Sequence, residues 1–166
     1  MTLQRVVVLA DTHLRAGRPR QLPDAIWAAI ADCQLVLHAG DVVDASLLGA
    51  LHDRHVPYRA VLGNNDLTLR DTLPERLEFD IEGVPVAMVH DSGAAKGRPA
   101  RLRRWFPDAQ VVVFGHSHAP CNEWHDGQLL FNPGSAAERR QQPARTFGVI
   151  EIDTGRVIKN EIRPTE

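Results

Sequence analysis

The sequence of 166 residues has few cysteines and no long apolar segment. Its two cysteines, Cys33 and Cys121, are too few for a disulfide framework and are not spaced as a metal-binding pair. The longest apolar run near the N-terminus, Val6–Ala10, is too short for the core of a signal peptide and far too short for a membrane span. These absences argue against a secreted protein and against a membrane partner, so we expect a cytoplasmic protein in a reducing compartment.

An excess of charge of one sign is also lacking. The chain has 19 lysines and arginines against 21 aspartates and glutamates, a formal net charge of −2 with neutral histidines. No global field therefore draws it to nucleic acid or to anionic lipid. Repeats, low-complexity tracts and long linkers are missing, and a chain of this length normally folds as one domain. We expect residues 1–166 to form a single domain without a nucleic-acid partner, and the sequence leaves a homo-oligomer open.

The first half of the chain alternates short β-branched runs with helical patterns. A nearly continuous apolar run such as Arg5–Ala10 is typical of a strand buried on both faces. Ser46 is the expected N-cap of the second helix. Strands and helices are predicted in turn at residues 5–10, 23–33, 35–39, 46–54 and 58–62. This order favours a parallel sheet with right-handed crossovers.

The second half has a different pattern. Residues 77–81 and 84–89 flank Glu82-Gly83, a two-residue connection typical of a hairpin. A short basic helix over 99–106 and a buried strand over 111–114 are expected next. The last three predicted strands, which we expect to be antiparallel, cover residues 128–131, 146–152 and 157–162. The expected fold class is therefore α/β, with two packed sheets and helices outside.

Polar residues that can bind metals follow five of the predicted strands. Ligands of α/β proteins bind just outside the carboxyl ends of the strands, where such loops converge. Each motif alone also has an ordinary explanation as a helix cap, a turn or a partly buried histidine. The motifs are Asp11-Thr12-His13, Gly40-Asp41-Val42-Val43-Asp44, Gly63-Asn64-Asn65-Asp66, His90-Asp91 and Gly115-His116-Ser117-His118. Their joint occurrence predicts one ligand site.

In this order, DTH, GDVVD, GNND, a lone histidine and GHSH resemble the motifs of the calcineurin-like metallophosphoesterases. The resemblance is to their small bacterial and archaeal phosphodiesterase branch, in which Asn132-Pro133-Gly134-Ser135 also recurs, and it extends over residues 5–155. It implies a four-layer α/β/β/α sandwich of two mixed sheets flanked by helices. It also implies a site for two divalent metal ions.

The resemblance assigns the metal ligands residue by residue. One ion would be held by Asp11, His13 and His118, and the second by Asn64, His90 and His116. Asp41 would bridge them, since a carboxylate has two charged oxygens that can hold two cations about 3.5–4 Å apart. Neutral histidines and an amide leave net positive charge to face a phosphate. Nitrogen and oxygen ligands suit Mn²⁺, the expected ion, with Fe, Zn, Ni, Co and Mg as alternatives.

The implied activity is hydrolysis of a small phosphoester substrate, most of all a phosphodiester, by a metal-bridging hydroxide that attacks phosphorus in line. The expected catalytic residues are Asp41, Asn65 and Asp66, the last through supporting hydrogen bonds. Asn65 stands where many members have the histidine that protonates the leaving alkoxide, and an amide has no proton to give at neutral pH. Slow turnover, or substrates with good leaving groups, would follow. Gly63 is expected to let the chain turn sharply so that Asn64 faces a metal.

Two other functions fit the same motifs. One is a phosphomonoesterase or nucleotide hydrolase, and the other is a metal-binding interaction scaffold, as in the retromer subunit that keeps this fold. Catalysis is favoured because all seven ligand positions hold residues that can bind a metal. Two further features are open to interpretation: His38 is expected to be a core or supporting histidine, and Asp44 either supports the site or caps a turn. A basic run suits either a solvated helix face or a rim that guides phosphates; it consists of Lys96, Arg98, Arg101, Arg103 and Arg104.

Overall fold

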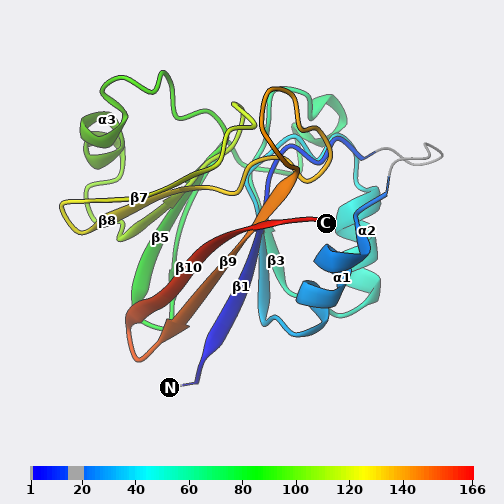
Figure 1. Cartoon of the computed structure of the whole chain (residues 1–166), viewed down its shortest axis with the longest axis horizontal. Helices are drawn as coiled ribbons and strands as arrows, with labels where there is room; N and C mark the ends of the chain where they lie inside the picture. Colours follow the sequence, from blue (N-terminus) through cyan, green and yellow to red (C-terminus); the bar gives the residue numbers. More distant parts are fainter. Residues whose placement is uncertain (1, 15–20) are drawn as a thin grey trace.

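Two mixed sheets of five strands face each other in the computed structural model, which describes residues 2–14 and 21–166 (Figure 1). In spatial order the first sheet contains β10 (Arg156–Pro164), β9 (Thr146–Asp153), β1 (Gln4–Leu9), β2 (Leu35–His38) and β3 (Tyr58–Ala60). The second contains β4 (Arg76–Ile81), β5 (Val84–Val89), β6 (Val111–Val113), β8 (Gln128–Asn132) and β7 (Cys121–His125). The predicted α/β class with two mixed sheets is confirmed.

The first sheet has the predicted crossover topology. β1, β2 and β3 are parallel, with Val7 opposite Val36 and Val36 opposite Tyr58. Helices α1 (Asp24–Ala31) and α2 (Ser46–Asp53) make the two crossovers. β9 is antiparallel to β1 and β10 is antiparallel to β9, as expected for these late strands.

The second sheet corrects one strand direction. β4 and β5 form the predicted hairpin, whose two turn residues Glu82 and Gly83 both have positive φ, at 48° and 89°. β8 was expected to be antiparallel, but it pairs in parallel with β6 and is antiparallel only to β7. The prediction therefore holds for one neighbour of β8 and fails for the other, and β7 itself was missed because its sequence CNEWH does not alternate apolar and polar residues.

Three apolar clusters make the four layers. Val6 and Val8 of β1 pack between the sheets, while Val7 and Leu9 of the same strand pack against α1 and α2. This alternation follows from the two-residue period of a strand. A third cluster joins the outer face of the second sheet to α3 (Arg98–Trp105). Figure 1 shows α3 on one side and α1 and α2 on the other, so the predicted α/β/β/α sandwich is confirmed.

The start of α2 differs from the prediction. Ala45, rather than Ser46, occupies the N-cap position, and it makes no side-chain capping bond. Asp44 Oδ1 instead accepts a hydrogen bond from the Ser46 amide at 2.9 Å. Asp44 therefore has the turn-capping role that was one of its two interpretations.

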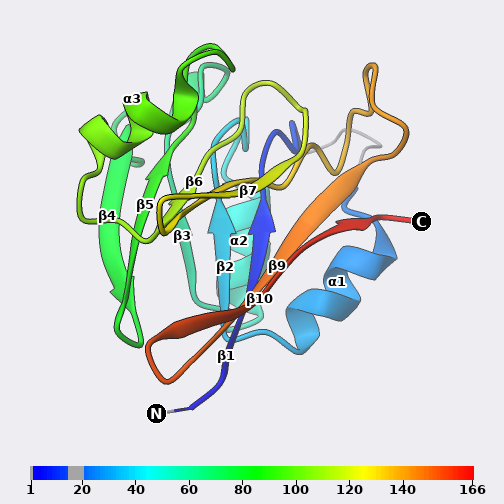
Figure 2. The same cartoon turned by 60° about the vertical axis from the view of Figure 1, so that its left-hand side comes forward.

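The parallel strands of both sheets place their carboxyl ends at one edge of the sandwich. The loops after β1, β2 and β3 meet those after β5 and β6 there, at the upper edge in Figure 2. The motif-bearing loops therefore come from five strands and converge on one region. No helix in the described ranges 2–14 and 21–166 is long and apolar enough to cross a membrane.

Gly148 provides a test of the packing between the sheets. It lies in β9 opposite Val8, and a Cβ there would lie 2.6 Å from Cζ of the fully buried Phe131. We expect Gly148→Ala to lower the free energy of unfolding by about 1–3 kcal/mol in urea denaturation, because the core has no room for the methyl group. Gly49→Ala is the matched control on α2, where nothing lies within 4 Å, and should be neutral or stabilising. Equal stability of Gly148→Ala and the wild type would contradict this packing.

Candidate metal centre

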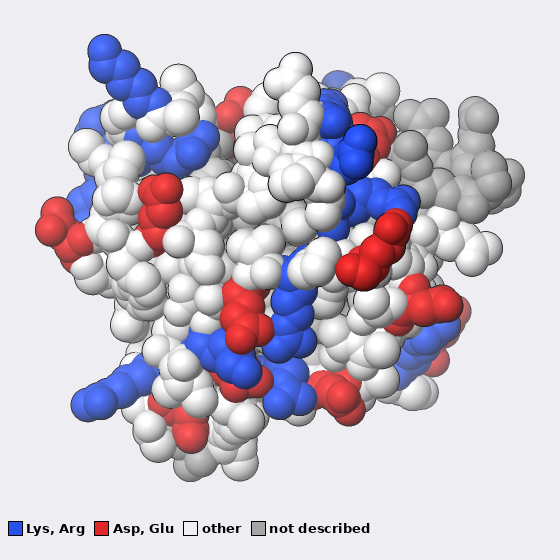
Figure 3. Space-filling view, viewed as in Figure 1, with Lys and Arg blue, Asp and Glu red and all other residues white. Residues whose placement is uncertain are grey.

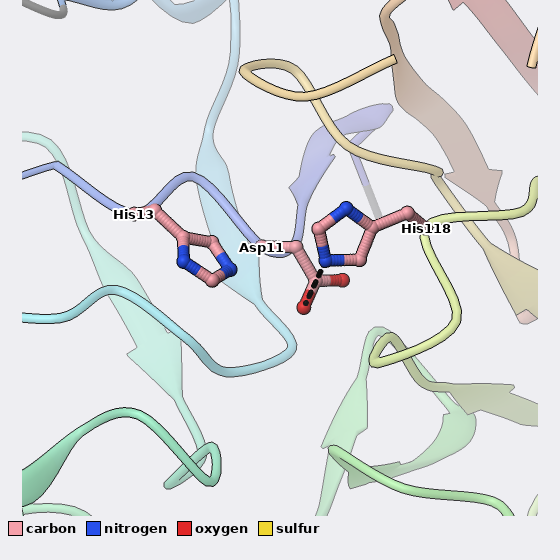
Figure 4. Close-up of side chains that lie close together, drawn as sticks. All are labelled: Asp11, His13 and His118. Carbon is pink, nitrogen blue, oxygen red and sulfur yellow. Dashed lines mark ion pairs between the residues drawn. The ribbon is translucent and has the colours of Figure 1, made fainter. Parts of the chain in front are cut away.

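The loop after β1 provides the centre of the first group of ligand atoms. Asp11 is fully buried, and it offers a ligand atom within 4.8 Å of ligand atoms from His13 and His118. His118 Nε2 lies 3.5 Å from Asp11 Oδ1. Figure 4 shows the two imidazole rings approaching the carboxylate from the loops after β1 and β6. This trio corresponds to the first predicted metal position.

A second group lies beside the first. Asp11, Asp41 and His90 also offer ligand atoms within 4.8 Å of one another. Asn64 Oδ1 lies 2.9 Å from His90 Nε2 and 3.2 Å from His116 Nδ1. Asn64, His90 and His116, predicted to share one ion, are therefore adjacent although they follow three different strands.

Asp41 lies between the two groups. Its Oδ2 is 3.4 Å from His13 Nε2 and 3.6 Å from His90 Nε2. Asn65 holds the carboxylate from the other side, because its backbone amide donates to Oδ1 and its side-chain amide donates to Oδ2, both at 2.8 Å. This position suits a bridging carboxylate, and the orientation is set by Asn65.

The residues fit divalent cations by a test that is independent of the motifs. Two buried side-chain atoms that face the site, Asp11 Oδ1 and His13 Nε2, have no hydrogen-bond partner. A buried polar atom left without a partner costs free energy, so native proteins normally satisfy it. Nitrogen and oxygen atoms at this spacing are suitable ligands for borderline divalent metals. The division of the seven residues between two ions stays a prediction.

The two aspartates of the site have pKa values shifted in opposite directions. Burial, followed by the charge of Asp41, raises the pKa of Asp11 to about 7. Burial acts in the same direction on Asp41, but the His13 ring 3.4 Å away and the hydrogen bonds from Asn65 outweigh it and lower the pKa of that carboxyl. Asp41 is thus the fixed negative charge of the site, and a cation would favour the ionised form of Asp11 too.

The buried histidines are kept neutral. Burial lowers the pKa of His118 to about 4 and also lowers the pKa of His90 below its usual value. His90 Nδ1 lies 2.7 Å from the carbonyl of Ala39, to which it can donate, leaving Nε2 facing Asn64 and Asp41. A neutral imidazole with a free lone pair is the form that binds a metal.

The backbone at the site is strained. Val43 has φ of 84°, a marked outlier for a β-branched residue. Non-glycine residues in this region cost free energy and cluster at functional sites, where the surroundings hold them in place. Five expected ligands also have positive φ, namely Asp11, His13, Asp41, His116 and His118.

Asp66 ties the strained loops together. Its buried carboxylate accepts hydrogen bonds from the backbone amides of Asp41 at 2.9 Å, Gly63 at 2.7 Å and Val43 at 2.5 Å. It was predicted among the catalytic residues through supporting hydrogen bonds, and its contacts are of that kind. The predicted turn is present, since the Asp66 amide donates to the Gly63 carbonyl at 3.3 Å, but Gly63 is not in the left-handed region; a glycine is needed there because a Cβ would overlap the amide and carboxylate of Asp41.

Residues 132–138 brace the site in a way that the sequence did not reveal. Ser135 Oγ donates to the carbonyl of Asp11 at 2.8 Å, and Asn132 Nδ2 donates to the carbonyl of Gly115 at 3.2 Å. Glu138 Oε2 lies 3.7 Å from His118 Nδ1. The recurring Asn-Pro-Gly-Ser motif pointed to the first two residues without a role, while no motif pointed to Glu138.

Two arginines of the basic run, Arg101 and Arg103, hold backbone carbonyls of nearby loops. Arg101 donates to the carbonyls of Ser92, at 2.7 Å, and Ala94, and so shapes the loop after His90. Arg103 donates to the carbonyl of Asp126 at 2.7 Å. Figure 3 shows basic groups at the upper left, where α3 lies in Figure 1, and acidic and basic groups interspersed elsewhere on this face. These contacts favour neither a solvated helix face nor a phosphate-guiding rim.

Comparisons with known proteins agree with this geometry. A family model described as a calcineurin-like phosphoesterase superfamily domain matches residues 5–155. A probable metallophosphoesterase of Methanothermobacter thermautotrophicus is 32% identical over 130 residues, which cover 77% of this chain and 74% of the relative.

Two solved structures share the fold. Vps29 of Entamoeba histolytica in complex with zinc is similar with a TM-score of 0.75 at 21% identity, covering 98% of this chain and 100% of that chain. An archaeal phosphodiesterase is similar with a TM-score of 0.70 at 18% identity, covering 96% of this chain and 100% of that chain. At these identities the likeness concerns the fold alone.

The buried side chain of His38 makes the stability of the fold depend on pH in a testable way. It is fully buried, its Nδ1 accepts from the Gly40 amide at 3.2 Å, and its Nε2 lies 2.9 Å from Thr12 Oγ1. An accepting Nδ1 makes the ring neutral with its proton on Nε2. Burial lowers the pKa of His38 from 6.5 to about 3. Between these values the unfolded chain binds the proton more readily, so this contribution to stability is complete above pH 6.5 and is lost as the pH falls.

We therefore expect the stability difference between the metal-free wild type and His38→Gln to shrink below pH 6.5. At its steepest, this difference in the free energy of unfolding changes by about 1.4 kcal/mol per pH unit. Urea denaturation across this pH range measures it, and comparing two variants cancels the opposite contribution of Asp11. His52→Gln, at an exposed position of α2, controls for the loss of a histidine. A difference that stays constant with pH would refute the neutral buried state.

Proposed function

Because the chain belongs to the calcineurin-like phosphoesterase superfamily, we propose that it is a metal-dependent phosphodiesterase that acts on a small phosphoester substrate. One observation carries the proposal. Seven side chains of metal-ligand type converge from five loops, and two of their buried atoms, Asp11 Oδ1 and His13 Nε2, face the site without a hydrogen-bond partner. A shared fold with an archaeal phosphodiesterase is consistent with it.

The ligands are proposed to serve two divalent cations, with Mn²⁺ as the ion. Asp11, His13 and His118 would hold one, Asn64, His90 and His116 the other, and Asp41 would contact both. Two such ions supply Lewis-acid stabilisation of phosphoryl oxygens and a hydroxide nucleophile at neutral pH.

The protein's own charges suit an anionic substrate. Two carboxylates, Asp11 and Asp41, offset only part of the charge of two divalent ions, and neutral His90 and His118 offset none. Asn64 adds a neutral oxygen where a third carboxylate would repel phosphate. The site therefore keeps net positive charge where the substrate must bind.

Asn65 has a positioning role in this proposal. Its two N–H groups hold both oxygens of Asp41, which fixes the orientation of the carboxylate. It cannot protonate a leaving alkoxide. Room for a second ester substituent exists beside Asn64 and His90, where a groove of about 590 Å³ opens. A diester with a good leaving group is the substrate that these features favour.

Hydrolysis of two model substrates tests the proposal. Purified protein is expected to release p-nitrophenol from bis(p-nitrophenyl) phosphate faster than from p-nitrophenyl phosphate, and only with added Mn²⁺. Asp41→Asn and His116→Ala should each lower the rate by about 100-fold or more, because each removes a proposed direct ligand. His125→Ala is the matched control, since His125 pairs with Glu123 on the distant strand β7.

The outcomes separate the candidate functions. Preference for the monoester would identify a phosphomonoesterase, and Mn²⁺ binding without hydrolysis would favour a scaffold. Absence of metal-dependent hydrolysis from both substrates would overturn the enzyme proposal. Full activity in both ligand variants would show that the reaction occurs elsewhere.

Substitution at Asn65 tests whether the reaction is limited by the lack of a residue that protonates the leaving group. We expect Asn65→His to raise the rate for phenyl esters relative to p-nitrophenyl esters, because phenolate is the poorer leaving group and gains more from a proton donor. Asn65→Ala is the control, as it removes the side-chain contact to Asp41 without adding an acid. The ratio of the two rates is the measurement. An unchanged ratio in Asn65→His would mean that leaving-group protonation does not limit the reaction.

A further inference from the structure

A groove of about 590 Å³ runs away from the second group of ligands. One end is formed by Asn64 and His90, and the walls come from the loop after β3 and the end of β5. The complete lining consists of Leu62, Gly63, Asn64, Arg70, Leu73, Glu75, Arg76, Val89, His90 and Asp91. A phosphoester bound at the metal centre would therefore project one of its substituents into this groove.

Arg76 is held in place on the groove wall. It pairs with Val89 across the β4–β5 ladder, one residue from His90. Its guanidinium lies over two rings of the α3 region, 4.5 Å from the centroid of Trp105 and 5.4 Å from that of Phe106. Stacking of this kind fixes the guanidinium plane while it leaves the N–H groups at the edge free to bind.

Arg70 is the second cation on the groove wall. It is exposed at the end of the short helix η1 (Leu67–Leu69). Within residues 2–14 and 21–166 neither Arg70 nor Arg76 makes an ion pair or a hydrogen bond through its guanidinium. Two guanidinium groups beside one groove thus retain their full donor capacity.

Two carboxylates, of Glu75 and Asp91, also line the groove and offset the charge of the two arginines. Asp91 Oδ2 lies 3.8 Å from His116 Nε2, at the metal end, and Glu75 precedes Arg76 in the chain. Two positive and two negative side chains give the groove lining no net charge. Recognition must therefore come from direct, forked N–H contacts at short range, which guanidinium groups make best with phosphate or carboxylate oxygens.

We propose that Arg70 and Arg76 are specificity-determining residues that bind a second anionic group on an ester substituent of the substrate. The preferred substrates are then phosphodiesters that carry an additional phosphate or carboxylate beyond the ester that is cleaved. This inference rests on the proposed phosphodiesterase function. A neutral substituent would leave the N–H groups of both guanidinium groups hydrogen-bonded to water alone and would gain nothing from them.

A matched pair of substrates tests the inference. Thymidine 5′-(p-nitrophenyl phosphate) and the same compound with an added 3′-phosphate differ only in the second anion. We expect kcat/KM to be about tenfold higher for the compound with the 3′-phosphate, mainly through a lower KM, since one charge-assisted contact is of this size. Arg70→Gln and Arg76→Gln should each bring the ratio between the two substrates toward one.

Arg59→Gln is the matched control variant. Arg59 is also an arginine stacked on an aromatic ring, 4.7 Å from the centroid of Phe79, but it lines a different cavity far along the sheet from the ligands. It should keep the wild-type ratio. A carboxylate in place of the 3′-phosphate distinguishes the two kinds of anion and should give a smaller gain, because it has fewer oxygens and less charge.

Binding of the products separates this inference from the proposed activity. Calorimetry with thymidine 3′,5′-bisphosphate and thymidine 5′-monophosphate, both with Mn²⁺, needs no hydrolysis. Tighter binding of the bisphosphate that is lost in Arg70→Gln and Arg76→Gln would support the groove even in a protein without activity. Hydrolysis of both esters at equal rates, with equal affinities for both products, would overturn the groove assignment and leave the phosphodiesterase proposal standing.

Discussion

The whole edge of the sandwich depends on keeping two aspartates, Asp11 and Asp41, buried next to each other. Burial and mutual repulsion both oppose this, and they raise the pKa of Asp11 to about 7. The protein holds one of the two charges through contacts to Asp41 from His13 and Asn65. It provides no donor for Asp11 Oδ1, so the charge of that carboxylate is compensated within the protein only in part. A cation between the aspartates is the simplest solution to this imbalance.

The strained loops follow from the same requirement. Ligands from five loops can face one point only if the backbone leaves its preferred conformations, which explains why so many non-glycine residues there have positive φ. Asp66 holds three backbone amides of two loops, and Ser135 holds the carbonyl of Asp11. Their position at the edge of two well-packed sheets supplies the rigidity that such loops lack on their own.

The sequence predicted the parts of this arrangement that are local. Arg5–Ala10 reads as a doubly buried strand because each face meets an apolar layer, and the motif order identified the ligand types. The parallel pairing of β8 with β6 escaped prediction because the antiparallel partner of β8 is β7, a polar edge strand with little periodicity that the sequence did not reveal. The function of Gly63 escaped because it depends on Asp41, a residue more than twenty positions earlier, and not on the conformation of the glycine itself.

The basic run and Asn65 illustrate the same limit for function. Arg101 is charged and close to His90 in sequence, yet its donors are directed at loop carbonyls, whereas Arg76, outside any motif, lines the groove. Asn65 was read as the absence of an acid, but its contacts show a residue that positions Asp41. In both cases the residue type indicated only whether a charge is present. The role of each side chain depends on the group that it contacts in the fold.

Binding of a cation at this site would be coupled to the stability of the fold. A ligand that binds the folded state and not the unfolded chain stabilises the fold in proportion to the logarithm of its concentration. Here the folded state contains residues with positive φ and buried polar atoms without a partner, and both lower the free energy of unfolding. The free energy gained when a cation binds would offset this loss. The three apolar clusters make this possible, since they stabilise the sandwich enough to keep an unfavourable edge folded. The candidate ligands are thus preorganised because the core, rather than the site, holds them in place.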